Sequence, residues 1–304
     1  MKSMSDVTGI KRRWYSNDAK KFVSLDADYR LTGAAFKHAS SYWEKILDFK
    51  TPSREFEIYF GHLKAAQENN IFQIGGIDIK DHMNLYIIAK GINPDIYVES
   101  GVFTGSSLHA ALVGIDADRV FGIDPVDIYL NDFLANLMVN PLIKDRDFAD
   151  LTFEPDNRKK VAYFDDHIDT SSRLLSAFEK GFQYAIFDDS TGFEGIGQRE
   201  YPALPTIGML RLLESLQVGD TFEWALQPRG NYMFLKKMIS GGIFKKFVRM
   251  KLEIDDEFMK KLHAMRECCD GIYEFPNLGE FLFSNHIGRL NTTTKYLVRF
   301  KTKI

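Results

Sequence analysis

Residues 95–109 read DIYVESGVFTGSSLH and change in character twice along their length. Residues 96–98 are a short apolar run of the kind that a buried parallel strand shows. Gly101 and Gly105 then allow the chain to turn, and the Thr and Ser residues around Gly105 favour a helix start. The stretch therefore predicts a strand, a glycine turn and a helix. The unpaired N–H groups of that helix start suit a ligand that carries a carboxylate or a phosphate.

Composition narrows the classes of function. The 304 residues carry a net charge of -3, which gives no electrostatic reason to expect nucleic acid or an anionic membrane as a partner. No stretch approaches eighteen consecutive apolar residues, and residues 1–20 lack the apolar centre of a signal peptide, so we expect a cytoplasmic protein. The only cysteines are Cys268 and Cys269, which as neighbours offer neither a disulfide framework nor a cysteine zinc site.

Residues 1–75 carry no cofactor motif and are rich in aromatic side chains. Helices are expected over residues 34–49 and 53–69, and Asp81 is expected to cap a further helix over residues 82–90. Aromatic residues at helical spacing pack a helix on a core or on a second subunit. We therefore expect a helical N-terminal extension that serves as a lid over the site or as the contact of a homodimer.

From residue 95 onward the pattern alternates between strands and helices, which is typical of a doubly wound, mostly parallel sheet. Residues 280–283 and 296–300 flank a polar turn and predict an antiparallel hairpin at the sheet edge. The expected fold is α/β, with a Rossmann-like sheet of seven strands. The other five strands are expected at 95–100, 120–124, 161–164, 183–188 and 221–226.

Acidic residues stand at the ends of three of these strands. Asp124 ends the second strand, residues 165–167 (Asp-Asp-His) follow the third, and Asp188 ends the fourth. The carboxyl ends of parallel strands meet at one edge of a sheet, so these side chains should lie near Gly101. Each acidic cluster taken alone is also typical of a plain helix cap. Their convergence on one edge is what indicates a binding site.

The spacing Glu-x-Gly-x-x-x-Gly at residues 99–105 resembles the first motif of class I S-adenosylmethionine-dependent methyltransferases. In that family the glycines let the backbone approach the methionyl part of the cofactor, and an acidic residue after the next strand binds the ribose, a place that Asp124 occupies. The resemblance covers roughly residues 78–300. It implies an S-adenosylmethionine-binding methyltransferase domain over residues 76–304. The implied cofactor-binding residues are Glu99, Gly101, Phe103, Thr104, Gly105, Ser106, Asp124, Asp165, Asp166 and Asp188.

Within that family, the sequence ESGV at residues 99–102 is similar to the macrocin-type O-methyltransferases and the cephalosporin-hydroxylase-like proteins. This implies methylation of a small-molecule hydroxyl, of a sugar or natural-product type. By the resemblance Asp165 or Asp166 lies near the adenine, and Asp188 lies near the methyl group and the acceptor. His167 is a candidate base, because an imidazole can take up a proton near neutral pH. Asp188 and His167 are therefore the candidate catalytic residues.

Many members of this group hold a magnesium ion through an aspartate after the fourth strand and an acidic pair after the fifth. Asp188 and Asp189 match the first of these positions. Residues 221–228, TFEWALQP, end without an acidic pair. A divalent ion prefers several charged oxygen ligands, so magnesium remains a candidate cofactor but is not favoured, and no metal ligand is assigned.

Two other classes of function remain open at this point. A dinucleotide-dependent oxidoreductase would use the same glycine turn and Asp124. A diverged, noncatalytic protein would keep the fold as a binding module. Comparing the binding of S-adenosylhomocysteine with that of NAD distinguishes a methyltransferase from the oxidoreductase. Measuring turnover distinguishes an enzyme from the noncatalytic protein.

Overall fold

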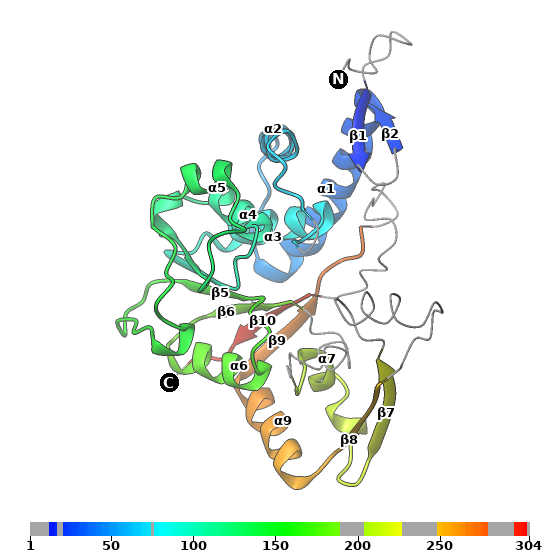
Figure 1. The fold of residues 1–304 in the computed structure, drawn as a ribbon, viewed down its shortest axis with the longest axis vertical. Coiled ribbons are helices and arrows are strands. Elements are labelled where there is room, and N and C mark those ends of the chain that lie inside the picture. The colour runs from blue at the N-terminus through cyan, green and yellow to red at the C-terminus, as the bar shows by residue number, and fades with distance from the viewer. Residues whose placement is uncertain are drawn as a thin grey trace, which may run out of the picture.

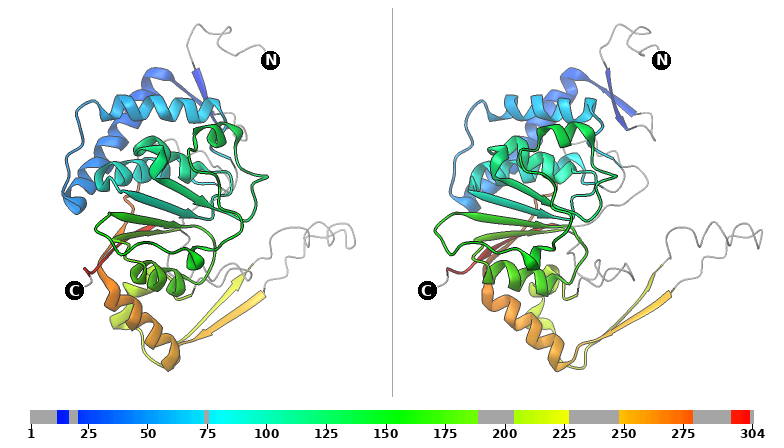
Figure 2. Two further views of the ribbon diagram at one scale, coloured as in Figure 1. Left: turned by 90° about the vertical axis from the view of Figure 1, so that its left-hand side faces the viewer. Right: turned by 60° about the vertical axis from the view of Figure 1, so that its left-hand side comes forward.

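The computed structural model describes residues 12–16, 21–73, 76–188, 204–226, 248–278 and 295–302. They form an α/β fold in which a mixed sheet lies between two layers of helices, as the edge-on views of Figure 2 show. The sheet has six strands in the order β4-β3-β5-β6-β10-β9 (Figure 1). The strands are β3 (Ile96–Ser100), β4 (Val120–Ile123), β5 (Lys160–Phe164), β6 (Tyr184–Phe187), β9 (Cys269–Glu274) and β10 (Tyr296–Phe300).

The strands β4, β3, β5 and β6 are parallel, and they match the first four predicted strands to within one residue at each end. Every residue of β3 and of β5 is buried, as expected for parallel strands that are covered on both faces. From β3 the chain passes to β4 on one side and then to β5 on the other. The order of the strands reverses beside β3, and ligands bind at such a point in open α/β sheets.

Alternate residues of the strands face opposite helix layers. Tyr97 and Tyr163 belong to one hydrophobic cluster, whereas Val98 and Ala162 belong to the other. None of the described helices is both long enough and apolar enough to cross a membrane. The first layer contains α1 (Leu25–Leu47), α2 (Glu55–Glu68), α3 (Ile79–Ile92), α4 (Ser106–Gly114) and α5 (Asp132–Leu137), and the second contains α6 (Thr170–Glu179), α7 (Ile207–Leu210) and α9 (Asp256–Cys268).

The far side of the sheet differs from the prediction. β10 is antiparallel, as expected, but it lies between β6 and β9 rather than at an edge. β9 was not predicted as a strand, and the predicted hairpin strand at 280–283 lies outside the described residues. On the opposite edge, β4 makes one isolated parallel bridge, between Ile123 and Ile143, among the residues that the structure describes.

The prediction that residues 221–226 join the main sheet was wrong. These residues form β7 (Thr221–Leu226), which pairs antiparallel with β8 (Val248–Glu253) in a separate ribbon that extends away from the sheet (Figures 1 and 2). Thr221 and Glu223 are exposed and Phe222 between them is half-buried. A strand with this alternation cannot replace a parallel strand that is buried on both faces. The described sheet therefore has six strands where seven were expected.

The N-terminal segment is not wholly helical, because β1 (Arg12–Ser16) and β2 (Lys21–Ser24) form an antiparallel pair before α1. Trp43 of α1 and Tyr59 of α2 are fully buried in the same cluster as the sheet residue Tyr97. The Trp43 indole donates a hydrogen bond to Asn84 Oδ1 of α3 (2.8 Å). These aromatic side chains therefore pack on the core of their own chain. The domain boundary at residue 75 and the lid or dimer role stay predictions.

The helix that leads into β3 begins earlier than predicted. Asp78 is its N-cap and accepts hydrogen bonds from the N–H groups of Lys80 and Asp81. Asp81, which was predicted to be the cap, instead lies in the first turn of α3. Its carboxylate is thereby available for a different interaction at the edge of the sheet.

Candidate functional site at the carboxyl edge of the sheet

The acidic strand ends meet at one edge of the sheet, as their positions in the sequence predicted. The residues that follow β3, β5 and β6 each donate their backbone N–H to a carbonyl at the end of the neighbouring strand, whereas Asp124, after β4, donates to Ile143 O (3.0 Å). The bonds run from Gly101 N to Ile123 O (2.9 Å), from Asp165 N to Ser100 O (2.9 Å) and from Asp188 N to Phe164 O (3.0 Å).

The glycine turn is required by the packing of the chain itself. Gly101 and Gly105 have φ values of +89° and +84°, in the region that favours glycine. A Cβ atom on Gly101 would lie 2.5 Å from the backbone carbonyl of Asp165, and one on Gly105 would overlap Leu134. The sequence resemblance ascribed these glycines to the approach of a cofactor. In the structure they also bring β3, β5 and α5 close together.

Glu99 lies beneath this turn and is fully buried. Its carboxyl group accepts hydrogen bonds from Ser107 Oγ (2.6 Å) and from the backbone N–H of Leu108, both in the first turn of α4. Burial raises the pKa of Glu99 to about 8, although these hydrogen bonds oppose the shift. Glu99 therefore supports the helix start from inside and would act on a bound ligand through the turn.

The N-terminus of α4 faces the same edge. Its N-cap, Gly105, has no side chain that could accept a hydrogen bond, and Glu99 accepts from the N–H of Leu108. Ser106 Oγ accepts a hydrogen bond from the backbone N–H of Ile77 (2.9 Å). Thr104 Oγ1 is buried and has no hydrogen-bond partner among the described residues. A buried hydroxyl without a partner costs about 1–3 kcal/mol. This hydroxyl and the first N–H groups of α4 are suited to an anionic ligand group.

Asp124 stands on the other side of the turn and is half-buried. Its two oxygens accept hydrogen bonds from the backbone N–H groups of Phe103 (2.8 Å) and Val126 (2.9 Å), which fix the plane of the carboxylate. The rings of Phe103 and Tyr129 lie 5.1 Å apart beside it, and they are 37% and 53% exposed. Each carboxylate oxygen keeps a second lone pair, so Asp124 can still accept hydrogen bonds from a ligand.

Asp166 is held by an ion-pair network that the sequence did not reveal. The buried Arg173 of α6 donates from Nε to Asp166 Oδ2 (2.8 Å) and from its two Nη atoms to the carboxylate of Asp147 (both 2.6 Å). Ser100 Oγ also donates to Asp166 Oδ2 (2.6 Å). The hydrogen bonds from Arg173 hold the pKa of Asp147 below its usual value. Asp166 thus has a structural role, and its contact with an adenine stays a prediction.

Asp188 lies in a second buried network at the same edge. Its Oδ1 accepts from Lys295 Nζ (2.6 Å), and its Oδ2 accepts from the Tyr163 hydroxyl (2.9 Å). Lys295 Nζ also lies 3.0 Å from Asp81 Oδ2. Sequence reasoning missed Lys295, because a single lysine before an apolar strand carries no motif. His167, the other candidate catalytic residue, has φ +56° in the loop that follows β5.

A different pair of titratable groups is buried between α3 and α4. His82 Nε2 and His109 Nδ1 are 2.9 Å apart, and His82 Nδ1 lies 3.3 Å from the Tyr59 hydroxyl. Burial lowers the pKa of His109 to about 4 and that of His82 well below its usual value. Both imidazoles are therefore neutral in the folded protein at mildly acidic pH.

This pair predicts a loss of stability in acid. Between pH 6.5 and about 4 an unfolded chain protonates both imidazoles while the folded chain leaves them neutral. Stability should therefore fall with pH by up to about 1.4 kcal/mol per pH unit for each histidine. His109→Gln should flatten this slope relative to the parent protein in urea titrations at several pH values. The exposed His263→Gln is the control, and equal slopes in all three proteins would contradict the assignment.

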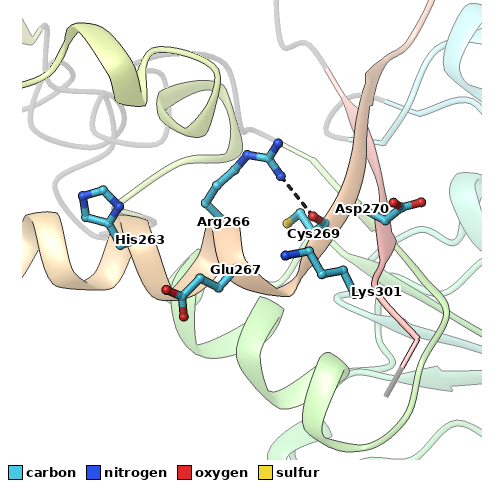
Figure 3. Close-up of a pocket in the computed structure, with 6 residues that line it drawn as sticks. All are labelled: His263, Arg266, Glu267, Cys269, Asp270 and Lys301. Atoms are coloured by element: carbon cyan, nitrogen blue, oxygen red, sulfur yellow. Dashed lines mark hydrogen bonds between the residues drawn. The ribbon is translucent and has the colours of Figure 1, made fainter. Parts of the chain in front are cut away.

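The cavity drawn in Figure 3 belongs to another part of the molecule. It has a volume of about 390 Å³ and lies where α9 passes into β9, beside the residue that follows β10. β10 runs antiparallel to β6, so this end of β10 lies at the opposite edge of the sheet from Asp188. The lining residues are His263, Arg266, Glu267, Cys269, Asp270 and Lys301, and Arg266 donates a hydrogen bond to the Cys269 carbonyl (3.0 Å).

No family model matches the chain, and no curated protein matches it. Among solved structures, a putative O-methyltransferase from Klebsiella pneumoniae is similar with 12% identity and a TM-score of 0.39, over 63% of this chain and 90% of that one. An O-methyltransferase from Bacillus cereus in complex with SAH is similar with 13% identity and a TM-score of 0.37, over 71% of this chain and 96% of that one. The O-methyltransferase TomG from Streptomyces achromogenes, in complex with SAM, is similar with 12% identity and a TM-score of 0.34, over 66% of this chain and 92% of that one. At TM-scores below 0.5, these similarities do not define the activity of this chain.

Proposed function

We propose that this protein is an S-adenosylmethionine-dependent methyltransferase that methylates a hydroxyl oxygen of a small molecule. One observation carries the proposal. The N-terminus of α4, whose N-cap is a glycine, and the carboxylate of Asp124 lie on two sides of the glycine turn, at the point where the strand order reverses. This arrangement offers donors to an anionic group and an acceptor to hydroxyl groups within one ligand.

The residues present fit this cofactor. The N–H groups at the start of α4 and the orphaned Thr104 hydroxyl suit its carboxylate, and Asp124 suits the two ribose hydroxyls. The exposed rings of Phe103 and Tyr129 offer an apolar surface beside Asp124 for a base. When bound, the cofactor supplies an electrophilic methyl group on a sulfonium. The contacts of Asp165 and Asp166 with the adenine remain part of the proposal, although β3 separates these residues from Asp124.

For the acceptor, the chain offers Asp188 and His167. Two hydrogen bonds fix Asp188, which can therefore align an acceptor hydroxyl without moving. His167 would take up the hydroxyl proton as the base. We further propose a sugar or natural-product acceptor of the macrocin type, a cytoplasmic location, and a homodimer formed through the N-terminal segment.

Calorimetry with S-adenosylhomocysteine and with NAD tests the proposal. We expect micromolar binding of S-adenosylhomocysteine, about −8 kcal/mol, and no measurable binding of NAD. Binding of NAD alone would instead support the dinucleotide-dependent oxidoreductase. If neither compound binds to the folded protein, the site is not a nucleotide site, and the noncatalytic alternative stands. An acceptor screen with S-adenosylmethionine as the donor then identifies the substrate.

A further inference from the structure

The position of Lys295 is fixed by the pairing of two strands. It directly precedes β10, whose first residue, Tyr296, pairs with Phe187 at the end of β6. Lys295 therefore lies opposite Asp188, the residue that follows β6. Its ammonium group is 2.6 Å from Asp188 Oδ1 and 3.0 Å from Asp81 Oδ2. One cation thus bridges the loop after β6 and the first turn of α3.

This cation is almost completely withdrawn from water. The side chain of Lys295 is 2% exposed and that of Asp188 is 7% exposed. Burial by itself would lower the pKa of Lys295, but the carboxylates of Asp188, Asp81 and Asp165 outweigh burial and raise this pKa well above its usual value. The group is a permanent positive charge within a set of carboxylates.

A magnesium ion does not fit beside Asp188 in this arrangement. Such an ion needs octahedral oxygen ligands at about 2.1 Å. Each oxygen of Asp188 already accepts one hydrogen bond, from Lys295 or from Tyr163, so at most one lone pair of each oxygen remains for a ligand. The facing oxygen of Asp81 is also paired with the ammonium group. A divalent ion bound there would be repelled by a buried charge of the same sign within a few ångströms.

We propose that the ammonium group of Lys295 is a built-in cation that takes the place of a divalent metal ion at the acidic edge of the sheet. It neutralises the carboxylates of Asp188 and Asp81, and it holds Asp188 in one orientation. The site then binds no divalent ion through Asp188 while Lys295 is present. The inference rests on the proposed function only in assigning Asp188 to the acceptor, since exclusion of metal follows from the contacts alone.

Manganese, which has a paramagnetic resonance signal when free in solution, is a direct probe of this inference. We expect the parent protein to bind no Mn²⁺ through Asp188. Lys295→Ala removes the cation and leaves space between the carboxylates, so it should bind Mn²⁺ at least about tenfold more tightly than the detection limit set by the parent. Lys295→Arg keeps the charge and should resemble the parent. The double variant Lys295→Ala/Asp188→Asn should lose the gained binding.

Two outcomes would overturn the inference. The first is Mn²⁺ binding by the parent protein that Asp188→Asn removes. The second is a folded Lys295→Ala protein, with an unchanged circular dichroism spectrum, that gains no Mn²⁺ binding. If Lys295→Ala does not fold, the comparison of the parent with Asp188→Asn still decides the question. Binding of S-adenosylhomocysteine is measured separately, so a failure of the methyltransferase proposal is distinguishable from a failure of this one.

Metal independence also has a functional readout. Once an acceptor is known, methyl transfer should continue in excess EDTA at an unchanged rate. If EDTA abolishes turnover and Mg²⁺ restores it, then the built-in cation does not replace the metal ion. Asp165, Asp166 and His167 would then be the first places to look for ligands.

Discussion

Replacing Arg173 with methionine is expected to lower the free energy of unfolding by about 3–5 kcal/mol. The Arg173 side chain is 3% exposed and pairs with both Asp147 and Asp166, so its loss leaves the 12% exposed carboxylate of Asp166 without its cation, while Asp147 is 39% exposed and stays solvated. Methionine keeps much of the volume of the arginine side chain, so the measured change in stability reports the loss of charge and not the opening of a cavity. Urea denaturation at pH 7 measures the effect.

A matched control is available in the same region. Arg146 is 61% exposed, and its ion pair with Asp145 is long, at 3.9 Å. Arg146→Met should cost less than about 1 kcal/mol, as exposed pairs do. A similar small loss for Arg173→Met would mean that the network around Asp166 does not hold the loop after β5. Adding Asp147→Asn and Asp166→Asn should recover part of the loss, because the unpaired charges are then removed.

Replacing Asp124 with asparagine is expected to weaken binding of S-adenosylhomocysteine by roughly ten- to a hundredfold. Asparagine keeps an oxygen for only one of the two backbone N–H groups that Asp124 holds, those of Phe103 and Val126, and it removes the charge that strengthens hydrogen bonds from ribose hydroxyls. Calorimetry measures the affinity, and thermal unfolding of the same sample shows whether the turn is intact.

Asp127 provides the comparison for this variant. It lies three residues further along, is about half exposed, and pairs with Lys144 rather than with the glycine turn. Asp127→Asn should leave the affinity unchanged. If Asp124→Asn changes the affinity for S-adenosylhomocysteine by less than about twofold, Asp124 does not bind the ribose, even though the compound binds to the protein.

The parallel half of the sheet could be predicted because its signals are local. Residues 96–98 and 161–164 are apolar runs bounded by polar residues, and both are buried strands. The strand character of residues 221–226 was equally visible, but a strand pattern does not specify its partner. The alternation of polar and apolar residues at Thr221, Phe222 and Glu223 favours an exposed ribbon over a strand that is buried on both faces.

The site was predictable to the extent that strand ends define it. Asp124, Asp165 and Asp188 could be placed at one edge because each directly follows a strand. Their partners could not be placed in this way. Lys295 is 107 residues from Asp188, and Arg173 reaches Asp147 from a helix that the sequence did not link to it. Such contacts depend on which strands and helices become neighbours, which local patterns do not encode.

The interior place of β10 has a consequence for synthesis of the chain. β6 is complete by residue 187, but its neighbour in the sheet is formed by residues 296–300, which are made after every other described strand. Until then one edge of β6 has unpaired N–H and C=O groups, as any open edge strand does. Chains that emerge from a ribosome at 5–20 residues per second would expose this edge for roughly 5–20 seconds. Over that interval the unpaired edge of β6 is a site at which a nascent chain could pair with another strand.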